Sequence, residues 1–315
     1  MSNFNHIPVL LQEVVQLLQP QPGHLFIDGT VGAGGHAAAI LEATAPNGRL
    51  LAFDKDAEAI TFARQRLAIF GDRVTFIQAS YAEMGQIAPT HTFHAVNGIL
   101  LDLGLSSRQL DDSQRGFSFM RTGPLDMRFD TTQGETAADL INNLTADELA
   151  DLFWQYGEER HSRRLARAIV SQRQTDGPFT TTTQLADFIA GQTRGQQRIH
   201  PATRIFQALR IAVNDELATV EQGVKTAVSL LKPGGRIAVI SFHSLEDRFV
   251  KQYFRQQSQS CICPPRQPIC TCAAQATLQL VTRKVVMASD AEIEANPRSR
   301  SARLRVAEKI TSNES

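Results

Sequence analysis

The chain has 315 residues, with 32 Lys and Arg against 32 Asp and Glu and an apolar fraction of 42%, which is ordinary for a globular protein. It has no run of about 18 apolar residues, which excludes a membrane-spanning helix, and residues 1–6 lack the basic and apolar regions of a signal peptide, so we expect a cytoplasmic protein. The length leaves room for a second lobe beside a minimal doubly wound domain.

The predicted elements begin with a helix over residues 6–18, where apolar residues recur at helical spacing ahead of two prolines. Short apolar runs then predict four buried strands, Leu25–Ile27, Arg49–Asp54, Val74–Gln78 and Asn97–Asp102, with helices that start at His36 and Lys55 after the first two. Strands that alternate with helices favour a parallel sheet with right-handed crossovers.

This alternation stops near Asp111, and residues 111–204 contain helical segments but no convincing strand pair: Thr145–Tyr156, with Thr145 and Glu148 as a capping box, Glu158–Arg173 and Thr180–Ile189. The α/β pattern returns in Pro201–Leu231 (helix), Arg236–Ser241 (strand), Leu245–Gln256 (helix), Leu278–Met287 (strand-like) and Arg303–Ile310 (strand-like). We therefore predict an α/β, doubly wound, Rossmann-like domain formed by residues 1–110 and 205–315, with a helical insertion of residues 111–204.

The zero net charge conceals a segregation around the insertion. Residues 111–157 contain three Arg against nine Asp and Glu, whereas residues 158–210 contain nine Arg against four Asp and Glu, with no Lys. An Arg-dominated face is typical of phosphate binding. The alternative interpretation is a solvated helix face that is balanced by its acidic neighbour.

The segment from Leu25 to His36 carries the strongest chemical signal. An apolar strand ends at Asp28, four glycines follow within seven residues, and a helix starts at His36. This order brings backbone N–H groups and a helix N-terminus to a nucleotide-like ligand. Asp54 lies 20 residues after Gly34, at the end of the second strand, where an acid meets ribose hydroxyls. A simple tight turn is the alternative.

The order of residues in this turn distinguishes between cofactors. The dinucleotide fingerprint is Gly-x-Gly-x-x-Gly with no acid before it, whereas Asp28–Gly34 is Asp-x-Thr-x-Gly-x-Gly. It resembles the first motif of S-adenosylmethionine-dependent methyltransferases, with Thr30 in place of the first glycine. A nicotinamide-dependent dehydrogenase is the alternative, but its second nucleotide-binding half is missing where this chain has its insertion.

Two further segments follow strands at the same predicted edge of the sheet. Asp102 ends the fourth strand, at the edge where methyltransferases that act on an exocyclic amine need an acceptor near the amine, and we favour this role. The alternative is that Asp102 only caps the following segment. After the fifth strand, Phe242 and His243 are candidates to contact a flipped base. The alternative for this second segment is a helix start with Ser244 as N-cap and Asp247 three residues later.

The C-terminal part has two other motifs. Cys261, Cys263, Cys270 and Cys272 form two Cys-x-Cys pairs, for which a zinc site is one interpretation, although zinc pairs are usually Cys-x-x-Cys. Residues 296–305 alternate Arg with small residues, which suits either phosphate contacts or a soluble edge strand.

Together these motifs resemble the ribosomal RNA small subunit methyltransferase H family, also called RsmH or MraW, over nearly the whole length of the chain. The segments that carry the resemblance are Asp28–His36, Leu100–Asp111, Arg115–Met120, Pro124–Arg128, Tyr156–Arg160, His200–Arg210, Ser241–Arg248 and Asn296–Ser301. Tyr81 stands where some members have Phe, which keeps an aromatic ring for the adenine.

The resemblance implies N4-methylation of a decoding-centre cytidine in small-subunit (16S) ribosomal RNA, within the small ribosomal subunit, with S-adenosyl-L-methionine as cofactor. It implies cofactor contacts at Gly34, Gly35, His36, Asp54, Tyr81, Asp102 and Gln109. Our hypothesis for catalysis names Asp102 and His243, and for substrate binding Phe117, Phe119, Arg204, Phe242, Arg298 and Arg300. We expect no membrane partner and no obligate protein partner. A non-catalytic ribosome-assembly factor with the same fold is the alternative.

Overall fold

The protein is described by a computed structural model that covers residues 8–192, 199–261, 263, 267, 271–272 and 274–311. It divides into two compact units, which are described separately here: a sheet unit, Met1–Gly104 with Thr219–Ser315, and a helical unit, Leu105–Ala218. Among the described residues, no helix has the length and apolar character needed to cross a membrane.

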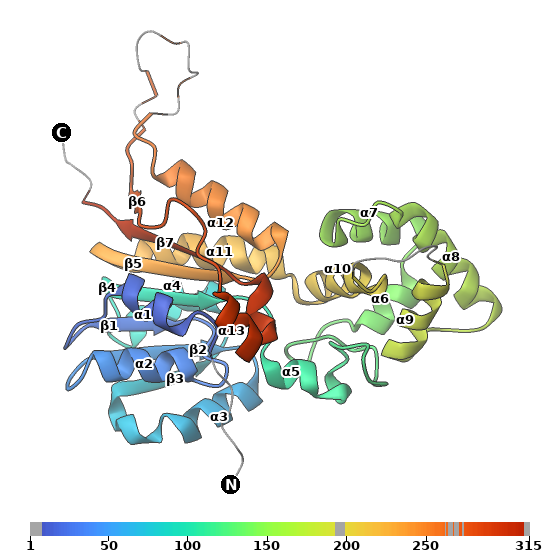
Figure 1. The fold of residues 1–315 in the computed structure, drawn as a ribbon, viewed down its shortest axis with the longest axis horizontal. Helices are drawn as coiled ribbons and strands as arrows, with labels where there is room; N and C mark the ends of the chain where they lie inside the picture. The colour runs from blue at the N-terminus through green and yellow to red at the C-terminus, as the bar shows by residue number, and fades with distance from the viewer. Residues whose placement is uncertain are drawn as a thin grey trace. The chain divides into compact units, whose positions relative to one another are not determined.

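The sheet unit is built on seven strands in the order β3-β2-β1-β4-β5-β7-β6 (Figure 1). The first five strands are parallel: β1 (Leu25–Asp28), β2 (Arg49–Asp54), β3 (Val74–Gln78), β4 (Val96–Asp102) and β5 (Leu231–Ser241). Strand β7 (Arg303–Lys309) runs antiparallel to β5, and β6 (Leu278–Leu280) runs antiparallel to β7. The predicted parallel sheet is therefore confirmed, with an antiparallel extension at one end.

Alternate residues of the central strands face opposite sides of the sheet, so each side has its own core. Ile27, Leu51 and Leu101 pack with α4 (Met84–Thr90), α11 (Glu216–Leu230) and α12 (Ser244–Gln257). Their neighbours Phe26, Leu50 and Leu100 pack with the helices of the other side, which are α1 (Leu11–Leu18), α2 (Gly35–Ala43) and α3 (Ala57–Arg66). The sheet unit is thus a three-layer α/β structure, as the sequence predicts.

Shorter elements connect these strands and helices in the sheet unit: η1 (Ala68–Arg73), η2 (Tyr81–Glu83), α13 (Asp290–Ala295) and η4 (Pro297–Ser301). The helix predicted to start at Lys55 starts at Ala57 and ends at Arg66, and Gly71 has a φ of 58° within η1. The strand predicted over 278–287 ends at Leu280, and further along Val286 forms an isolated bridge with Leu304.

The described part of the helical unit starts with two short elements, α5 (Ser107–Asp111) and η3 (Ser113–Arg115). The helices that follow are α6 (Ala137–Asn143), α7 (Ala146–Gly157), α8 (Ser162–Thr175), α9 (Thr182–Gly191) and α10 (Ala202–Asn214). The predicted capping box of α7 is confirmed, since Thr145 accepts from the Glu148 N–H and Glu148 accepts from the Thr145 N–H. The core of this unit includes Phe153, Ile169 and Leu185.

The long helix predicted over Pro201–Leu231 is two helices. Asp215 between them has a φ of 48°, a left-handed conformation that Asp tolerates better than most residues. Ile205 and Leu209 of α10 are buried in the core of the helical unit. For this reason the helical unit extends to Ala218, past the predicted boundary at residues 204/205, and it starts at Leu105 instead of residue 111.

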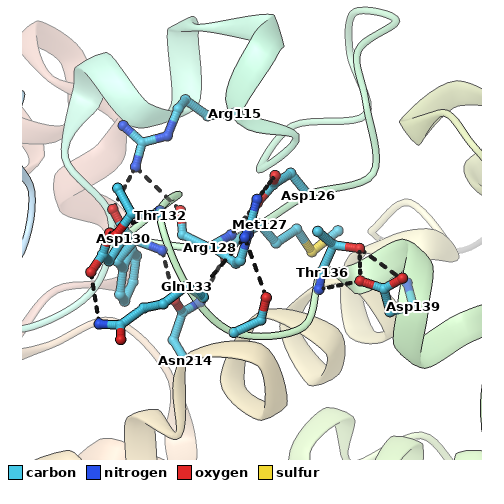
Figure 2. A network of polar contacts seen from close by, with 12 residues as sticks. Arg115, Asp126, Met127, Arg128, Asp130, Thr132, Gln133, Thr136, Asp139 and Asn214 are labelled. Atoms are coloured by element: carbon cyan, nitrogen blue, oxygen red, sulfur yellow. Dashed lines mark hydrogen bonds and ion pairs between the residues drawn. The ribbon is translucent and has the colours of Figure 1, made fainter.

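A polar network organises the loop that precedes α6 (Figure 2). Arg115 donates to the carbonyl oxygens of Arg128 (3.2 Å) and Phe129 (2.9 Å), and Arg128 forms a two-pronged pair with Asp126 (2.9 and 2.7 Å). Asn214 of α10 accepts from the Phe129 N–H and donates to the Met127 carbonyl oxygen, both at 2.7 Å. Residues that carry the family resemblance therefore fix the backbone of this loop.

Candidate functional site

The carboxyl ends of the parallel strands carry the candidate site of the sheet unit. Asp28, Asp54 and Asp102 are the last residues of β1, β2 and β4. Strands β1 and β4 are adjacent, and β1 also pairs with β2, so these three acids lie at one edge of the sheet. Ligands of open α/β sheets bind at this edge.

The glycine turn after β1 is held on both sides by the neighbouring strands. The Gly29 N–H donates to the Leu100 carbonyl oxygen (2.9 Å), and the Val31 N–H donates to that of Phe53 (2.8 Å). Thr30 accepts a hydrogen bond of 2.6 Å from the Asp102 N–H through its hydroxyl. The residue that replaces the first glycine of the motif thus ties the turn to the end of β4.

Glycine is required where this turn approaches its neighbours. A Cβ atom on Gly29 would lie 2.4 Å from Leu101 Cδ2 and 2.9 Å from Tyr81 Cβ. Gly34, at the N-cap of α2, has a φ of 75° and offers no side chain to accept from the first N–H groups of that helix. Those donors are therefore available to an anionic group of a ligand. Gly35 begins the helix and packs against Pro8, since its Cβ would lie 2.2 Å from Pro8 Cγ.

Burial raises the pKa of all three strand-end carboxyls. The pKa of Asp102 is raised to about 8, by burial first and then by the charges of Asp28 and Glu246. That of Asp28 is raised to about 7 by burial, which outweighs its hydrogen bond from the Thr30 N–H. The pKa of Asp54 is raised to about 6, again mainly by burial. Such a cluster of acids favours a ligand that carries positive charge.

Asp102 has unused acceptor capacity. Its Oδ1 atom is buried and has no hydrogen-bond partner in the described part of the chain. Its Oδ2 atom lies 3.6 Å from Nδ1 of His36. A buried carboxylate oxygen without a donor is costly, so it indicates a place for a ligand donor.

His36 is buried at the start of α2, 7% exposed. Its Nε2 atom lies 2.9 Å from the carbonyl oxygen of Val9. Because a carbonyl oxygen only accepts, Nε2 carries the proton, and in the neutral ring Nδ1 is the bare nitrogen that faces Asp102. His36 therefore lies beside Asp102 on the inner side of this edge of the sheet.

Asp54 and Tyr81 were predicted to contact the ribose and the adenine. The carboxyl oxygens of Asp54 accept backbone N–H groups, including those of Gly32 (2.9 Å) and Asp56 (3.0 Å), which hold the side chain at the end of β2. Tyr81 is half-buried at the start of η2. A Cβ on Gly223 of α11 would lie 2.3 Å from its ring, so glycine at that position makes room for the aromatic side chain.

The predicted role of Ser244 as N-cap of α12 is wrong. His243 is the N-cap, and it forms a capping box with Glu246, whose N–H lies 3.5 Å from His243 Nδ1. The His243 Nε2 atom lies 3.1 Å from Glu246 Oε1. Glu246 Oε2 also accepts from the N–H of Phe242 (2.9 Å). These contacts give His243 a structural role, and Phe242 packs near Gly104, whose Cβ would lie 3.2 Å from the Phe242 ring.

Four candidate residues lie in the helical unit. Gln109 and Ser106 exchange two hydrogen bonds, of 3.0 and 3.2 Å, at the start of α5. Phe117 is 7% exposed and stacks on Phe129 in the core, which argues against the predicted role in stacking on a base.

The other two candidates of the helical unit are less buried. Phe119 stacks on the ring of His200 at 4.7 Å and meets Phe206 edge-on. Arg204 is 43% exposed and lies 3.7 Å from Glu159 Oε2.

The arginines of the C-terminal segment differ in their partners and in their exposure. Arg303 and Arg305 both pair with Asp247 of α12, at 3.2 and 2.6 Å, so they hold β7 against that helix. Strand β7 lies between β5 and β6, which excludes the edge-strand interpretation. Arg298 is half-buried and Arg300 is exposed in η4, so Arg300 is the arginine of the pair with the more accessible charge.

Three cysteines of the two Cys-x-Cys pairs are described. The Sγ atoms of Cys261, Cys263 and Cys272 all lie within 4.8 Å of one another. Cys270 lies outside the described residues.

Sequence reasoning missed two groups of this site. Glu246 is 1% exposed and its charge acts on Asp102, and Asp28 is 1% exposed and acts on it as well. The sequence did contain a signal for Asp28, because this acid directly follows the first apolar run. Nothing in the sequence placed Glu246 beside Asp102, because its position depends on how α12 returns to the sheet.

These features define the class of protein: a Rossmann-like domain whose glycine turn, helix N-terminus without a side-chain cap, and buried acids suit a cofactor with an anionic group, a ribose and a positive charge. S-adenosyl-L-methionine has all three, since its amino-acid part carries a carboxylate and an ammonium and its sulfur is a sulfonium.

Comparison with known proteins identifies the family. The model of the MraW methylase family matches residues 3–310. The chain is 53% identical over 310 residues to the ribosomal RNA small subunit methyltransferase H of Syntrophotalea carbinolica, covering 98% of both chains. It is 52% identical over 310 residues to the enzyme of the same name from Geobacter sulfurreducens, covering 98% of this chain and 99% of that one. The chain belongs to the MraW methylase family and is an S-adenosyl-L-methionine-dependent methyltransferase.

Proposed function

We propose that this protein methylates the exocyclic N4 of a decoding-centre cytidine in small-subunit (16S) ribosomal RNA. The observation that carries the proposal is the 53% identity, over 98% of both chains, to a ribosomal RNA small subunit methyltransferase H. The choice of cytidine and of N4 rests on the resemblance of the motifs. The buried acceptor at Asp102 supports it, because amine methylation needs an acceptor at the amine.

The cofactor supplies an electrophilic methyl group on a sulfonium sulfur. The residues of the sheet unit account for its binding. We assign the ribose hydroxyls to Asp54, the adenine to Tyr81, and the carboxylate of the methionine part to the start of α2 at Gly35 and His36. Gly34 lies in the same turn, and its own N–H donates to the Val31 carbonyl oxygen (2.7 Å). We assign Gln109 to the same cofactor site through the resemblance alone.

Asp102 has two candidate roles at the reacting end. It accepts a hydrogen bond either from the ammonium of the methionine part or from the cytosine amine. The lone pair of the cytosine amine is delocalised into the ring. When the amine donates a hydrogen bond to a carboxylate, electron density on its nitrogen increases. The pKa of about 8 also makes the Asp102 carboxylate basic enough to take the proton that the amine loses after methylation. His36 lies next to this carboxyl group, with Nδ1 3.6 Å from Oδ2.

For the helical unit we propose RNA recognition, within the predicted insertion. Four arginines just before α8 and in its first turns are exposed: Arg160, Arg163, Arg164 and Arg167. Trp154 of α7 is 60% exposed. Exposed guanidinium groups suit phosphates, and an exposed indole suits an unstacked base. Arg204 and Arg300 would add further phosphate contacts, and Phe119 and Phe242 are the aromatic candidates for the extruded cytosine.

A labelling experiment tests the function. The protein is incubated with methyl-labelled S-adenosyl-L-methionine and small ribosomal subunits from cells that lack this activity, and the RNA is digested to nucleosides. We expect label in N4-methylcytidine. Label in another nucleoside, or none with the cofactor bound, would exclude the proposed reaction. In the second case the non-catalytic assembly factor becomes the better hypothesis. Asp102→Ala is the matched variant, and full transfer by it would exclude both roles of Asp102.

A further inference from the structure

The connection between α12 and β6 spans residues 258–277 and contains all four cysteines of the chain. A connection of 20 residues is long for a compact domain. Ile262 and Ile269 are the large aliphatic residues of this sequence, too few to form a core. The sequence of the connection therefore offers little apolar packing of its own.

Both ends of the connection are fixed to the sheet unit. The Thr277 N–H donates to the Gln257 carbonyl oxygen, and the Thr277 hydroxyl donates to the Gln257 side chain, both at 2.8 Å. The Ile310 N–H donates to the Thr277 carbonyl oxygen at 3.0 Å. The two ends of the connection are thus held together at Gln257 and Thr277.

Three thiols of this connection lie close together. Cys261 and Cys263 belong to the segment that follows α12, and Cys272 belongs to the segment that precedes β6. Their three Sγ atoms lie within 4.8 Å of one another, and the Cys261 and Cys272 sulfurs are 3.9 Å apart.

This spacing fits a shared metal ion. Zinc–sulfur bonds of about 2.3 Å in a tetrahedral site place neighbouring sulfurs about 3.8 Å apart. A disulfide would require a sulfur–sulfur distance of about 2.05 Å. The 3.9 Å between Cys261 and Cys272 therefore corresponds to one edge of a zinc tetrahedron. Clustered thiolates select zinc over harder ions such as magnesium or calcium.

We propose that Cys261, Cys263 and Cys272 bind a structural zinc ion that closes this loop. Binding replaces the thiol protons, so each ligand enters as a thiolate and its proton is released to water. The ion links the segment after α12 to the segment before β6. None of its three proposed ligands is among the residues to which we assign cofactor binding or methyl transfer.

Metal content tests the proposal. The full-length protein is expressed with added zinc, purified without chelator and dialysed, and zinc is measured by mass spectrometry. We expect one zinc per chain, and loss of the zinc in Cys261→Ser and Cys272→Ser. Thr271→Ser, within the same loop, is the matched control and should keep the metal.

Cobalt supplies a second readout that does not depend on activity. Co²⁺ added to the metal-free protein should give thiolate charge-transfer absorption and the visible bands of a tetrahedral site, and Cys272→Ser should weaken both. Circular dichroism of each variant checks that the sheet unit is folded. Less than about 0.1 zinc per chain, or zinc that is retained equally by the folded Cys→Ser variants, would overturn the proposal.

Discussion

The imidazole Nδ1 of His36 lies 3.6 Å from Oδ2 of Asp102, and the opposite ring nitrogen contacts the carbonyl oxygen of Val9 at 2.9 Å. Three segments far apart in sequence therefore meet at one histidine. The contact with Val9 sets the tautomer of His36, so the nitrogen without a proton faces Asp102. Of the three strand-end carboxyl groups, Asp102 has the highest pKa. This arrangement links cofactor binding to the protonation of Asp102.

Affinity for S-adenosyl-L-methionine should rise with pH up to about 8. The pKa of Asp102 is raised to about 8 in the free protein, so the carboxyl group is largely protonated at neutral pH. Binding of a cationic cofactor favours ionisation of the Asp102 carboxyl group, which releases a proton. The affinity for the cofactor therefore rises by up to about tenfold per pH unit below the pKa of Asp102. Calorimetric titrations between pH 6 and 9 measure this.

The controls for this pH dependence are two carboxyl-to-amide variants. Asp102→Asn should bind the cofactor weakly and with a much flatter pH profile. Asp72→Asn, which alters an exposed carboxyl group elsewhere in the sheet unit, should keep the wild-type profile. A wild-type affinity that is independent of pH across this range would contradict the assignment of Asp102.

Asp247→Asn should destabilise the protein by about 2–4 kcal/mol, because it leaves the largely buried Arg305 without its carboxylate partner. Chemical denaturation measures this loss. Glu221→Gln, which breaks the exposed pair with Lys225, is the control and should cost less than about 0.5 kcal/mol. Equal losses in the two variants would show that β7 does not depend on Asp247.

The same ion pair predicts a loss of stability in acid. Burial alone would raise the pKa of Asp247, but the hydrogen bonds and charges of Arg305 and Arg303 lower it below its usual value of 3.8. A lowered pKa in the folded state means that the stabilisation is present above about pH 4. It is lost as the pH falls through the folded-state pKa. In Asp247→Asn this part of the acid dependence should be absent.

Asn214→Ala should destabilise the helical unit by about 2–4 kcal/mol. The substitution removes the partners of the Phe129 N–H and the Met127 carbonyl oxygen (Figure 2), and each buried group left unpaired costs about 1–3 kcal/mol. Thermal unfolding followed by circular dichroism measures this. Asn143→Ala, at an exposed position of α6, should change stability by no more than about 0.5 kcal/mol. An unchanged melting temperature for Asn214→Ala would contradict the role of the network.

Arg164→Ala on α8 should weaken RNA binding and make it less sensitive to salt. Loss of one phosphate contact lowers the slope of log affinity against log salt concentration by about 0.7–0.9. Binding to a fluorescent RNA at several salt concentrations measures the slope. Lys225→Ala removes an exposed charge from the sheet unit and should leave the slope unchanged. If both variants retain the wild-type slope, the exposed face of α8 does not contact RNA.

The sequence was sufficient to predict the elements that depend on local signals. Strands β2 and β3 have the predicted bounds, and the Thr145–Glu148 capping box is present, because apolar runs and capping residues act over a few positions. The break at Asp215 was missed, since the apolar periodicity continues across it while the two helices pack in different cores. The capping role of His243 was missed because Ser is the more usual N-cap.

The site was predictable in part for the same reason. Asp102 at the end of β4 follows from the strand pattern, and Asp54 follows from its distance to the glycines. The unpaired Oδ1 of Asp102 and the contact with His36 depend on how distant segments meet, which the sequence pattern does not encode. The burial of Phe117 is of this kind too, because an exposed and a buried Phe have the same local sequence signal.

The insertion of the helical unit between β4 and β5 has a consequence during synthesis. Strand β4 ends at Asp102, and its partner β5 starts at Leu231, so β4 is an unpaired edge of a growing sheet while about 130 residues are made. At roughly 5–20 residues per second this exposure lasts on the order of ten seconds. The helical unit, whose contacts are more local, can fold in that interval. Completion of the sheet then waits for β7, which follows β5 by more than 60 residues, so β5 is exposed as an edge for a second, shorter interval.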